Sequence, residues 1–257
     1  MHRFFISPEE KNADRIVFSA AHAKQISRVL RLEAGERCVV LDNLGNEWLV
    51  ELTHCEASSV EAQVVTRSAA EEPETKLTLY ISLTQREKFE WILQKGTEVG
   101  VSVFQPIITS RTLVQNRKDV EAKYERWRSI IQEAAEQSGR GRLPVLLPAL
   151  GFSEALQQAA QKVDLRLILW EGEVAATLKQ ALTRQPAKSV TIFIGPEGGF
   201  SAEEVEQAVN AGFEAVTLGK RILRMETAAL VSAALVFHEL ETITPSGAAA
   251  SSSARLQ

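Results

Sequence analysis

The chain has 257 residues, of which 45% are hydrophobic and 24% charged, and its formal net charge is −4. This length suits two domains, and the composition is that of an ordinary soluble globular protein. Cys38 and Cys55 form no CxxC motif and the four histidines are scattered, so we expect neither a disulfide framework nor a metal site. No apolar run reaches membrane-spanning length and the N-terminus lacks a signal-peptide core, which favours a cytoplasmic protein.

Residues 15–67 have the pattern of short strands and turns. The run RCVVLDNLGNEWLVEL alternates in polarity around a turn at Asn43–Asn46 and predicts a hairpin, and SSVEAQVV repeats the alternation. Before the hairpin, AAHAKQISRVLRLEAGE predicts a helical segment that ends near Gly35. We therefore expect a small β-rich barrel domain over residues 1–72, followed by the acidic linker AAEEPET.

From Lys76 onward, apolar strand patterns alternate with helical patterns, which predicts a mostly parallel sheet with helices on both faces. This second α/β domain is expected over residues 76–243, and the low-complexity tail 244–257 is expected to be disordered. The expected strands are 77–83, 104–109, 165–170, 190–195 and 215–219, and the expected helices are 86–101, 118–139, 174–184, 202–211 and 226–241.

Charge is unevenly distributed along the chain. Residues 1–75 carry 8 Lys+Arg against 13 Asp+Glu, residues 76–142 carry 12 against 8, and residues 143–257 carry 9 against 12. The basic middle could face a polyanion, because the local field matters more than the total charge. Charge alone favours the simpler alternative of a solvated helix surface.

A glycine-rich corner, GPEGGFS (195–201), joins the strand VTIFI to a helix. Gly198 and Gly199 allow positive φ and a close approach of the backbone to a ligand, and Ser201 with Glu204 fits a capping box. Backbone N–H groups would then gather at the carboxyl end of a buried strand, where open α/β sheets bind ligands. A plain turn explains one such corner equally well. The corner is neither a P-loop nor GxGxxG, and its acid, Glu197, favours a ligand with a donor or a positive centre.

A second unusual loop, LGKRILRMETA (218–228), follows the next strand, and Glu171 and Gly172 follow another. Together with the corner these loops would form three walls of one pocket. A salt bridge between Arg224 and Glu226 at the start of the last helix is the structural alternative for those two side chains.

GPEGGFS followed by LGKRILRMETA resembles the SPOUT methyltransferases, which have a trefoil-knotted α/β domain. RFF near the N-terminus, HAKQISRVLRLEAGE, LQKGTEVGV, ITSRT and EAAEQSGR further resemble the ribosomal RNA small-subunit methyltransferase E family. This resemblance implies an N-terminal PUA-like barrel, a knotted methyltransferase domain and a homodimer. It also implies S-adenosylmethionine as cofactor and N3 of uridine 1498 in 16S ribosomal RNA as the methyl acceptor, within the small ribosomal subunit.

The resemblance assigns the pocket residues to cofactor binding, and we expect Arg224 to be catalytic because it can stabilise negative charge on the uracil oxygens. The expected cofactor-binding residues are Leu169, Glu171, Gly172, Gly195, Pro196, Glu197, Gly198, Gly199, Leu218, Gly219, Ile222, Leu223, Arg224 and Thr227. The candidate RNA contacts are Arg3, Arg28, Arg31, Arg111, Arg140 and Arg142.

Three alternatives remain open from the sequence. The chain could be a knotted methyltransferase for another ribosomal or transfer RNA position, or an RNA-binding factor without activity; a nucleotide-dependent dehydrogenase is the weakest, since GxGxxG is missing. The last helix is apolar over most of its circumference, which favours a homodimer, although complete burial within one chain explains it too. Ala229 and Ala233 would permit close helix packing in either case.

Overall fold

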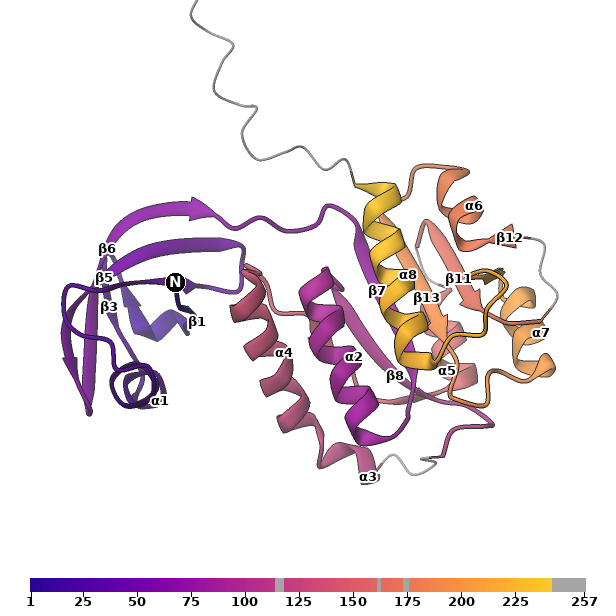
Figure 1. Cartoon of the computed structure of the whole chain (residues 1–257), viewed down its shortest axis with the longest axis horizontal. Helices are drawn as coiled ribbons and strands as arrows, with labels where there is room; N and C mark the ends of the chain where they lie inside the picture. The colour runs from indigo at the N-terminus through magenta and orange to yellow at the C-terminus, as the bar shows by residue number, and fades with distance from the viewer. Residues whose placement is uncertain (114–117, 161–162, 173–175, 242–257) are drawn as a thin grey trace, which may run out of the picture.

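The computed structural model describes residues 1–113, 118–160, 163–172 and 176–241. Figure 1 shows a small N-terminal β domain joined by an extended segment to a larger α/β domain. The tail 244–257, which we expect to be disordered, and the predicted start of a helix at residue 174 lie outside the described residues. None of the described helices is both long and apolar enough to cross a membrane.

The N-terminal domain is a six-stranded sheet in the order β1-β4-β5-β6-β3-β2, in which only the β1–β4 pair is parallel. Its buried side chains include Ile16, Ile26, Val40 and Val50, all completely buried. The predicted hairpin is present as β4 and β5. The elements are β1 (Arg3–Phe5), β2 (Lys11–Asn12), β3 (Arg15–Val17), β4 (Arg37–Leu41), β5 (Asn46–Glu56), β6 (Ser59–Ala69), a 3-10 turn η1 (Pro8–Glu10), α1 (Ala20–Lys24) and a π-helical turn η2 (Gln25–Val29).

The predicted helix of this domain is shorter than expected and ends before Gly35. Arg31 adopts a left-handed conformation with φ 56°, and the Leu32 N–H donates back to the carbonyl of Ile26 at 3.0 Å. A left-handed residue with a backward hydrogen bond is a common way to end a helix, usually with glycine at that position. Arginine takes this place here, so the glycine signal in the sequence pointed four residues too far along the chain.

The second domain is built on a parallel sheet in the order β10-β8-β7-β13-β11-β14-β12, with β9 paired to β8. Its strands are β7 (Lys76–Ser82), β8 (Val103–Ile108), β9 (Val145–Leu146), β10 (Leu150–Gly151), β11 (Leu165–Leu169), β12 (Ala176–Thr177), β13 (Ser189–Ile194) and β14 (Glu214–Thr217). Its helices are α2 (Arg86–Val99), α3 (Lys118–Glu121), α4 (Tyr124–Ser138), α5 (Phe152–Ala159), α6 (Leu178–Thr183), α7 (Ala202–Asn210) and α8 (Met225–Leu240).

Helices cover both faces of this sheet, as predicted (Figure 1). On one face, α2, α4, α6 and α8 enclose a core with Leu77, Leu79 and Ile192. On the other face, α5 and α7 pack against Tyr80 and Phe193, whose rings stack at 4.4 Å between centroids. The α/β class with a separate β domain is therefore confirmed.

Several elements differ from the predicted pattern. The short strands β9, β10 and β12 were not predicted, and β12 occupies Ala176–Thr177 of the helix expected over 174–184. The helix expected over 118–139 is interrupted between α3 and α4, where the Lys123 N–H donates to the Val120 carbonyl at 2.9 Å and closes a turn. The turn keeps Val120 and Trp127 on the same buried side. The helix α5 was not predicted, because eight residues give too few turns to establish a helical period.

Part of the apolar surface of α8 is buried within the same chain. Ala229, Ala233 and Val236 are completely or almost completely buried against the sheet and its neighbouring helices. Val231 and Ala234 remain exposed. Ala233 therefore belongs to the core of the single chain, and only the other side of α8 is left for a partner.

Glu90 on α2 joins α2 to α4. It accepts hydrogen bonds from Arg126 at 2.7 and 2.9 Å and from Arg86 at 2.8 Å, and its side chain is only 13% exposed. The hydrogen bonds from Arg126 and Arg86 outweigh partial burial and lower the pKa of Glu90 to about 2. Because the folded pKa lies below the unfolded value, the stabilisation is present above pH ~4.5 and is lost as the pH falls toward ~2.

We predict that Glu90→Gln lowers the free energy of unfolding by about 1 kcal/mol at pH 7, a modest value because both arginines are largely exposed to solvent. The difference from wild type should shrink between pH ~4.5 and ~2. Urea unfolding across this pH range measures it, with the exposed Glu87→Gln as control. A Glu90→Gln deficit that is independent of pH would contradict this account.

Candidate functional site

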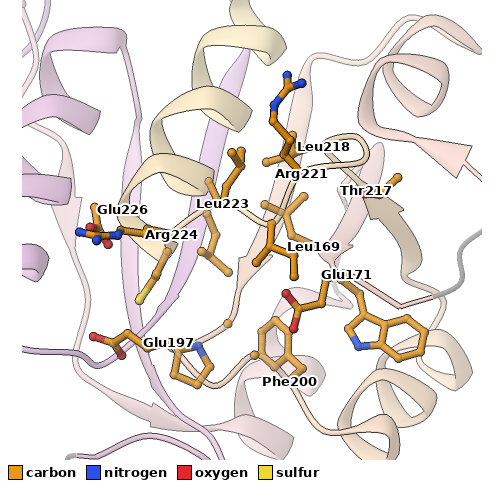
Figure 2. Close-up of a pocket in the computed structure, with 18 of the residues that line it drawn as sticks. Leu169, Glu171, Glu197, Phe200, Thr217, Leu218, Arg221, Leu223, Arg224 and Glu226 are labelled. Atoms are coloured by element: carbon orange, nitrogen blue, oxygen red, sulfur yellow. The ribbon is translucent and has the colours of Figure 1, made fainter.

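A pocket of about 430 Å³ opens where β11, β13 and β14 end. Three segments form its walls: the glycine corner after β13, the loop between β14 and α8, and the turn after β11 (Figure 2). A side chain from α2, Lys88, completes the lining. A volume of this size is in the range of sites for small molecules and cofactors.

The glycine corner is braced by polar bonds on both sides. The Gly199 N–H donates to the Pro196 carbonyl at 2.9 Å, and Gly199 has φ 67°, which strongly favours glycine. The predicted capping box is present, since the Glu204 N–H donates to Ser201 Oγ and the Ser201 N–H to Glu204 Oε2. Glu204 Oε1 also accepts from the Ser110 N–H at 2.8 Å, which ties the corner to the segment after β8.

Gly198 has neither the positive φ nor the place in the pocket lining that we predicted from the sequence. Its φ is not in the left-handed region, it is not among the lining residues, and a Cβ there would make ordinary contact with the aliphatic part of Arg111 at 3.6 Å. Arg111 donates from Nη1 to the Gly198 carbonyl at 2.8 Å. Positive φ is thus required at Gly199 alone, and Gly198 serves to support Arg111 from outside the pocket.

The loop after β14 leaves its backbone open toward the pocket. Gly219 has φ 120°, and a Cβ added there would meet no atom within 4 Å. Thr217 holds this turn, because its Oγ1 accepts from the Gly219 N–H and donates to the Gly219 carbonyl. Arg224 then precedes α8, and its carbonyl accepts the first helical bond from the Ala228 N–H at 2.8 Å. The exposed Arg224 side chain lies at the pocket beside Glu226 (Figure 2).

The salt bridge considered between Arg224 and Glu226 does not form among the described side chains. Glu226 Oε2 is instead buried without a hydrogen-bond partner in the described structure. The guanidinium of Arg224 therefore lies at the pocket without an ion pair to Glu226.

The turn after β11 contributes Glu171 and the ring of Trp170 to the lining. Glu171 Oε1 lies 3.3 Å from the position a Cβ would take on Gly199, so this carboxylate borders the glycine corner. The Trp170 ring covers Gly172, where a Cβ would come within 2.5 Å of the indole. Gly172 is therefore needed for packing under the tryptophan and is not part of the lining.

Glu197 is held ionised at the pocket wall. It accepts from the Thr84 hydroxyl and from Lys88 Nζ at 2.9 Å. Burial by itself raises the pKa of Glu197, but the hydrogen bonds from Thr84 and Lys88 outweigh it and hold that pKa below its ordinary value. Glu197 therefore stays ionised near neutral pH, and its charge is balanced by Lys88, which lines the same pocket.

The structure brings together most of the residues predicted for the cofactor site. Gly172, Gly198 and Thr227 do not belong to the lining. Those that line the pocket are Leu169, Glu171, Gly195, Pro196, Glu197, Gly199, Leu218, Gly219, Ile222, Leu223 and Arg224.

Sequence reasoning missed lining residues that adjoin the predicted loops, including Trp170, Phe200, Thr217 and Lys220. It also missed Lys88, for which the sequence holds no signal because it lies on the polar side of a helix far away in the chain.

The six arginines considered for RNA separate into two groups. Arg28, Arg31, Arg111 and Arg142 are exposed. Arg140 is only 7% exposed and its guanidinium is paired with Glu72 at 2.8 Å. Arg3 is half-buried with its guanidinium against Gly139. The assignment of Arg140 to an RNA surface is wrong, because its donors are used inside the protein, and Arg3 lies at the same junction between the domains.

Within the described residues, no group of three or more His, Cys, Asp or Glu side chains is arranged to hold a metal ion. Both cysteines are free thiols, and burial raises the pKa of Cys38 to about 12.

We predict that Lys88→Met raises the pKa of Glu197, because the variant removes a positive partner and leaves the burial in place. Carbon-detected NMR titration of the Glu197 carboxyl group measures the change. Lys220→Met is the matched control, since Lys220 lines the same pocket but donates to Glu197 in no described contact. An unchanged Glu197 titration in Lys88→Met would show that Thr84 alone holds the charge.

Comparison with known proteins gives a consistent family. The family model described as an RNA methyltransferase domain matches residues 70–237, and the model described as an RNA methyltransferase PUA domain matches residues 26–65.

Named relatives and a solved structure agree with the family models. The ribosomal RNA small subunit methyltransferase E of Synechocystis is 36% identical, over 94% of this chain and 78% of the relative. The protein of the same name from Bacillus subtilis is 31% identical, over 95% and 98%. A ribosomal RNA small subunit methyltransferase E from Neisseria gonorrhoeae, solved bound to S-adenosyl methionine, superposes with a TM-score of 0.83 at 32% identity over 93% of this chain and 97% of the other. The chain therefore belongs to the ribosomal RNA small subunit methyltransferase E family of RNA methyltransferases.

Proposed function

We propose that this protein transfers a methyl group from S-adenosylmethionine to N3 of uridine 1498 in 16S ribosomal RNA. The main support for the proposal is the pocket at the carboxyl ends of three parallel strands, which is lined by the glycine corner and the 218–224 loop. The name of the relatives supports methylation of small-subunit ribosomal RNA, and the Neisseria structure, solved with S-adenosyl methionine, supports the cofactor. The proposal places the protein in the cytoplasm with the small ribosomal subunit as its partner.

The residues of the pocket fit S-adenosylmethionine. The space at Gly219, where a Cβ would meet no atom within 4 Å, leaves room for a planar base, and the volume of about 430 Å³ suits a molecule of this size. Glu171 places a carboxylate at the wall beside Gly199, which complements a cation. When bound, this cofactor supplies an electrophilic methyl group on a positively charged sulfur.

Arg224 is our candidate for the catalytic side chain. Methylation of N3 requires the loss of the N3 proton, and negative charge then spreads over the two uracil carbonyl oxygens. An exposed guanidinium at the pocket, unpaired with Glu226, can donate to one of these oxygens and stabilise that charge. Most of the remaining acceleration comes from holding N3 in line with the methyl group.

The acceptor nitrogen lies on the base-pairing edge of uridine, so the target base must be unpaired or turned out of its helix. We propose that Arg28 and Arg31 on the N-terminal domain, and Arg111 and Arg142 on the second domain, contact the RNA backbone. All four are exposed. Phosphate contacts of this kind give salt-dependent affinity and set the orientation of the RNA.

The dimer, the knot and the domain limits are part of the same proposal. We propose a homodimer through the exposed side of α8, where Val231 is 36% exposed, and the loop before it, where Ile222 is 80% exposed. Apolar side chains of this size on one segment favour a protein partner. We also propose domains over 1–72 and 76–243, and a trefoil knot around the pocket.

The function is tested by mapping methylated uridines in 16S ribosomal RNA from cells with and without the gene, followed by addition of purified protein and radiolabelled S-adenosylmethionine to subunits from the deficient cells. We expect 3-methyluridine at position 1498 to disappear in the deficient cells and to return with the protein. Methylation at another position would favour a knotted methyltransferase of different specificity. Cofactor binding without any methylation would favour an inactive RNA-binding factor.

We predict that Gly199→Val lowers the affinity for S-adenosylmethionine more than tenfold. A β-branched residue at φ 67° costs of order 1–3 kcal/mol of strain, and its side chain would push against Glu171. Calorimetry measures the affinity, and Gly198→Ala is the control, expected to bind within about threefold of wild type because its Cβ has ordinary space. If Gly198→Ala bound S-adenosylmethionine more weakly than Gly199→Val, cofactor binding would depend on Gly198 and not on Gly199, which would contradict this prediction.

We predict that Val231→Arg converts a dimer into a monomer, since a charge placed in an apolar interface loses its hydration. Sedimentation at low micromolar concentration measures the assembly, and Val209→Arg on α7 is the control at a comparably exposed valine. Ala233→Arg would not serve, because Ala233 is completely buried within the chain. A wild-type protein that sediments as a monomer would refute the dimer.

A further inference from the structure

The junction between the two domains contains a buried ion pair that neither core requires. Glu72 lies in the connecting segment and its carboxylate is met by the guanidinium of Arg140, with Nε at 3.0 and 3.1 Å and Nη2 at 2.8 Å. The N–H groups of Gly141 and Arg142 donate to the same carboxylate at 2.7 and 3.0 Å. The Arg140 and Glu72 side chains are 8% and 17% exposed. Such charge-assisted, forked contacts fix geometry more strictly than a single hydrogen bond.

Arg140 also holds one end of α2. Its Nη1 donates to the carbonyls of Thr97 and Val101 at 3.0 and 3.1 Å, at the carboxyl end of that helix. The other end of α2 carries Lys88, which lines the pocket and pairs with Glu197. At a rise of 1.5 Å per residue, roughly 14 Å of α2 separate Lys88 from Thr97. The helix α2 therefore reaches from the junction to the lining of the pocket.

The N-terminal domain is held at the same place by its hairpin. Asn43 Oδ1 accepts from the Leu143 N–H at 2.6 Å, and Arg142 Nη2 donates to the Leu44 carbonyl at 2.5 Å. Gly141 fits closely here, because a Cβ would lie 2.2 Å from the Cβ of Ala70. The hairpin, the connecting segment and the residues after α4 thus form one tightly packed junction.

Each domain has a core of its own away from the junction. The N-terminal core, with Ile16 and Val50, and the two cores on the faces of the parallel sheet are separate clusters. Among the described residues, one small buried apolar cluster, in which Phe5 and Leu41 meet Ala135 of α4, crosses between them. Breaking the Glu72–Arg140 pair should therefore leave both domains folded while loosening their relative placement.

We propose that Glu72 and Arg140 are positioning residues that set the distance and angle between the RNA-binding surface of the N-terminal domain and the methyl-transfer pocket. This inference rests on the proposed function. An RNA that contacts both domains binds as a bivalent ligand, and its affinity depends on the fixed spacing of the two sites. The bonds from Arg140 to Thr97 and Val101 that hold α2 do not involve Glu72, so we expect loss of the Glu72 charge to leave cofactor binding in the pocket intact.

The test uses the full-length protein with isolated small ribosomal subunits from cells lacking the gene. Glu72→Gln keeps the size of the side chain and removes its charge. We expect it to raise the KM for subunits at least tenfold, to change kcat less than threefold, and to leave the affinity for S-adenosylmethionine within twofold of wild type. Asn43→Gly removes the Oδ1 acceptor and tolerates the positive φ of that residue; we expect a KM increase of about threefold.

Two controls separate positioning from loss of stability. Glu71→Gln removes a neighbouring exposed charge from the same segment, and Ile16→Val truncates the N-terminal core; both should keep the wild-type KM for subunits at a temperature well below unfolding. An unchanged KM in Glu72→Gln overturns the inference. An equal rise in Ile16→Val, or a parallel loss of cofactor affinity in Glu72→Gln, overturns it as well. Failure of the wild-type protein to methylate any subunit would instead refute the proposed function.

Discussion

The parallel pairing of β13 between β7 and β11 determines where the pocket lies. All three strands run in the same direction, so their carboxyl ends, and that of β14 beside β11, meet at one edge of the sheet. The middle of β13 is fixed in the core, because Ile192 and Phe193 are completely buried on opposite faces of the sheet. Segments that are separated by dozens of residues in the chain are brought together at this edge, where open α/β sheets generally bind ligands.

The pocket is preorganised by bonds from elements that do not themselves line it. Glu204 both caps α7 and accepts from Ser110 in the segment after β8. Arg111, from the same segment, holds the carbonyl of Gly198, and the Ser82 hydroxyl donates to the Ile194 carbonyl. A loop that is fixed before its ligand arrives loses less conformational entropy on binding. This support explains how a glycine-rich corner can be a precise site.

The sequence predicted the parts of the site in which chemistry and local geometry coincide. Gly199 and Gly219 sit where the backbone needs positive φ, and Ser201 and Glu204 form the capping pair that their spacing predicts. Lys88 could not be predicted, because its role comes from the approach of α2 to the corner, a tertiary contact without a sequence signal. Gly172 and Gly198 show the converse limit: both are glycines at strand ends, yet one is covered by Trp170 and the other supports Arg111.

Arg140 shows why a buried arginine can be mistaken for an RNA contact when only the sequence is considered. Glycines on both sides of an arginine indicate a mobile, exposed segment when only the sequence is considered. In the structure Gly139 ends α4 in a left-handed conformation and Gly141 provides space for Ala70, so both glycines serve close packing. The five donors of an arginine suit it equally well to a phosphate and to a buried carboxylate surrounded by carbonyl groups. An acidic residue close to the arginine favours the buried role. Here that residue is Glu72, in the acidic segment that connects the domains. One acid before the second domain, Glu72, is therefore the partner of Arg140, which removes that arginine from the positive charge available to RNA in the middle of the chain.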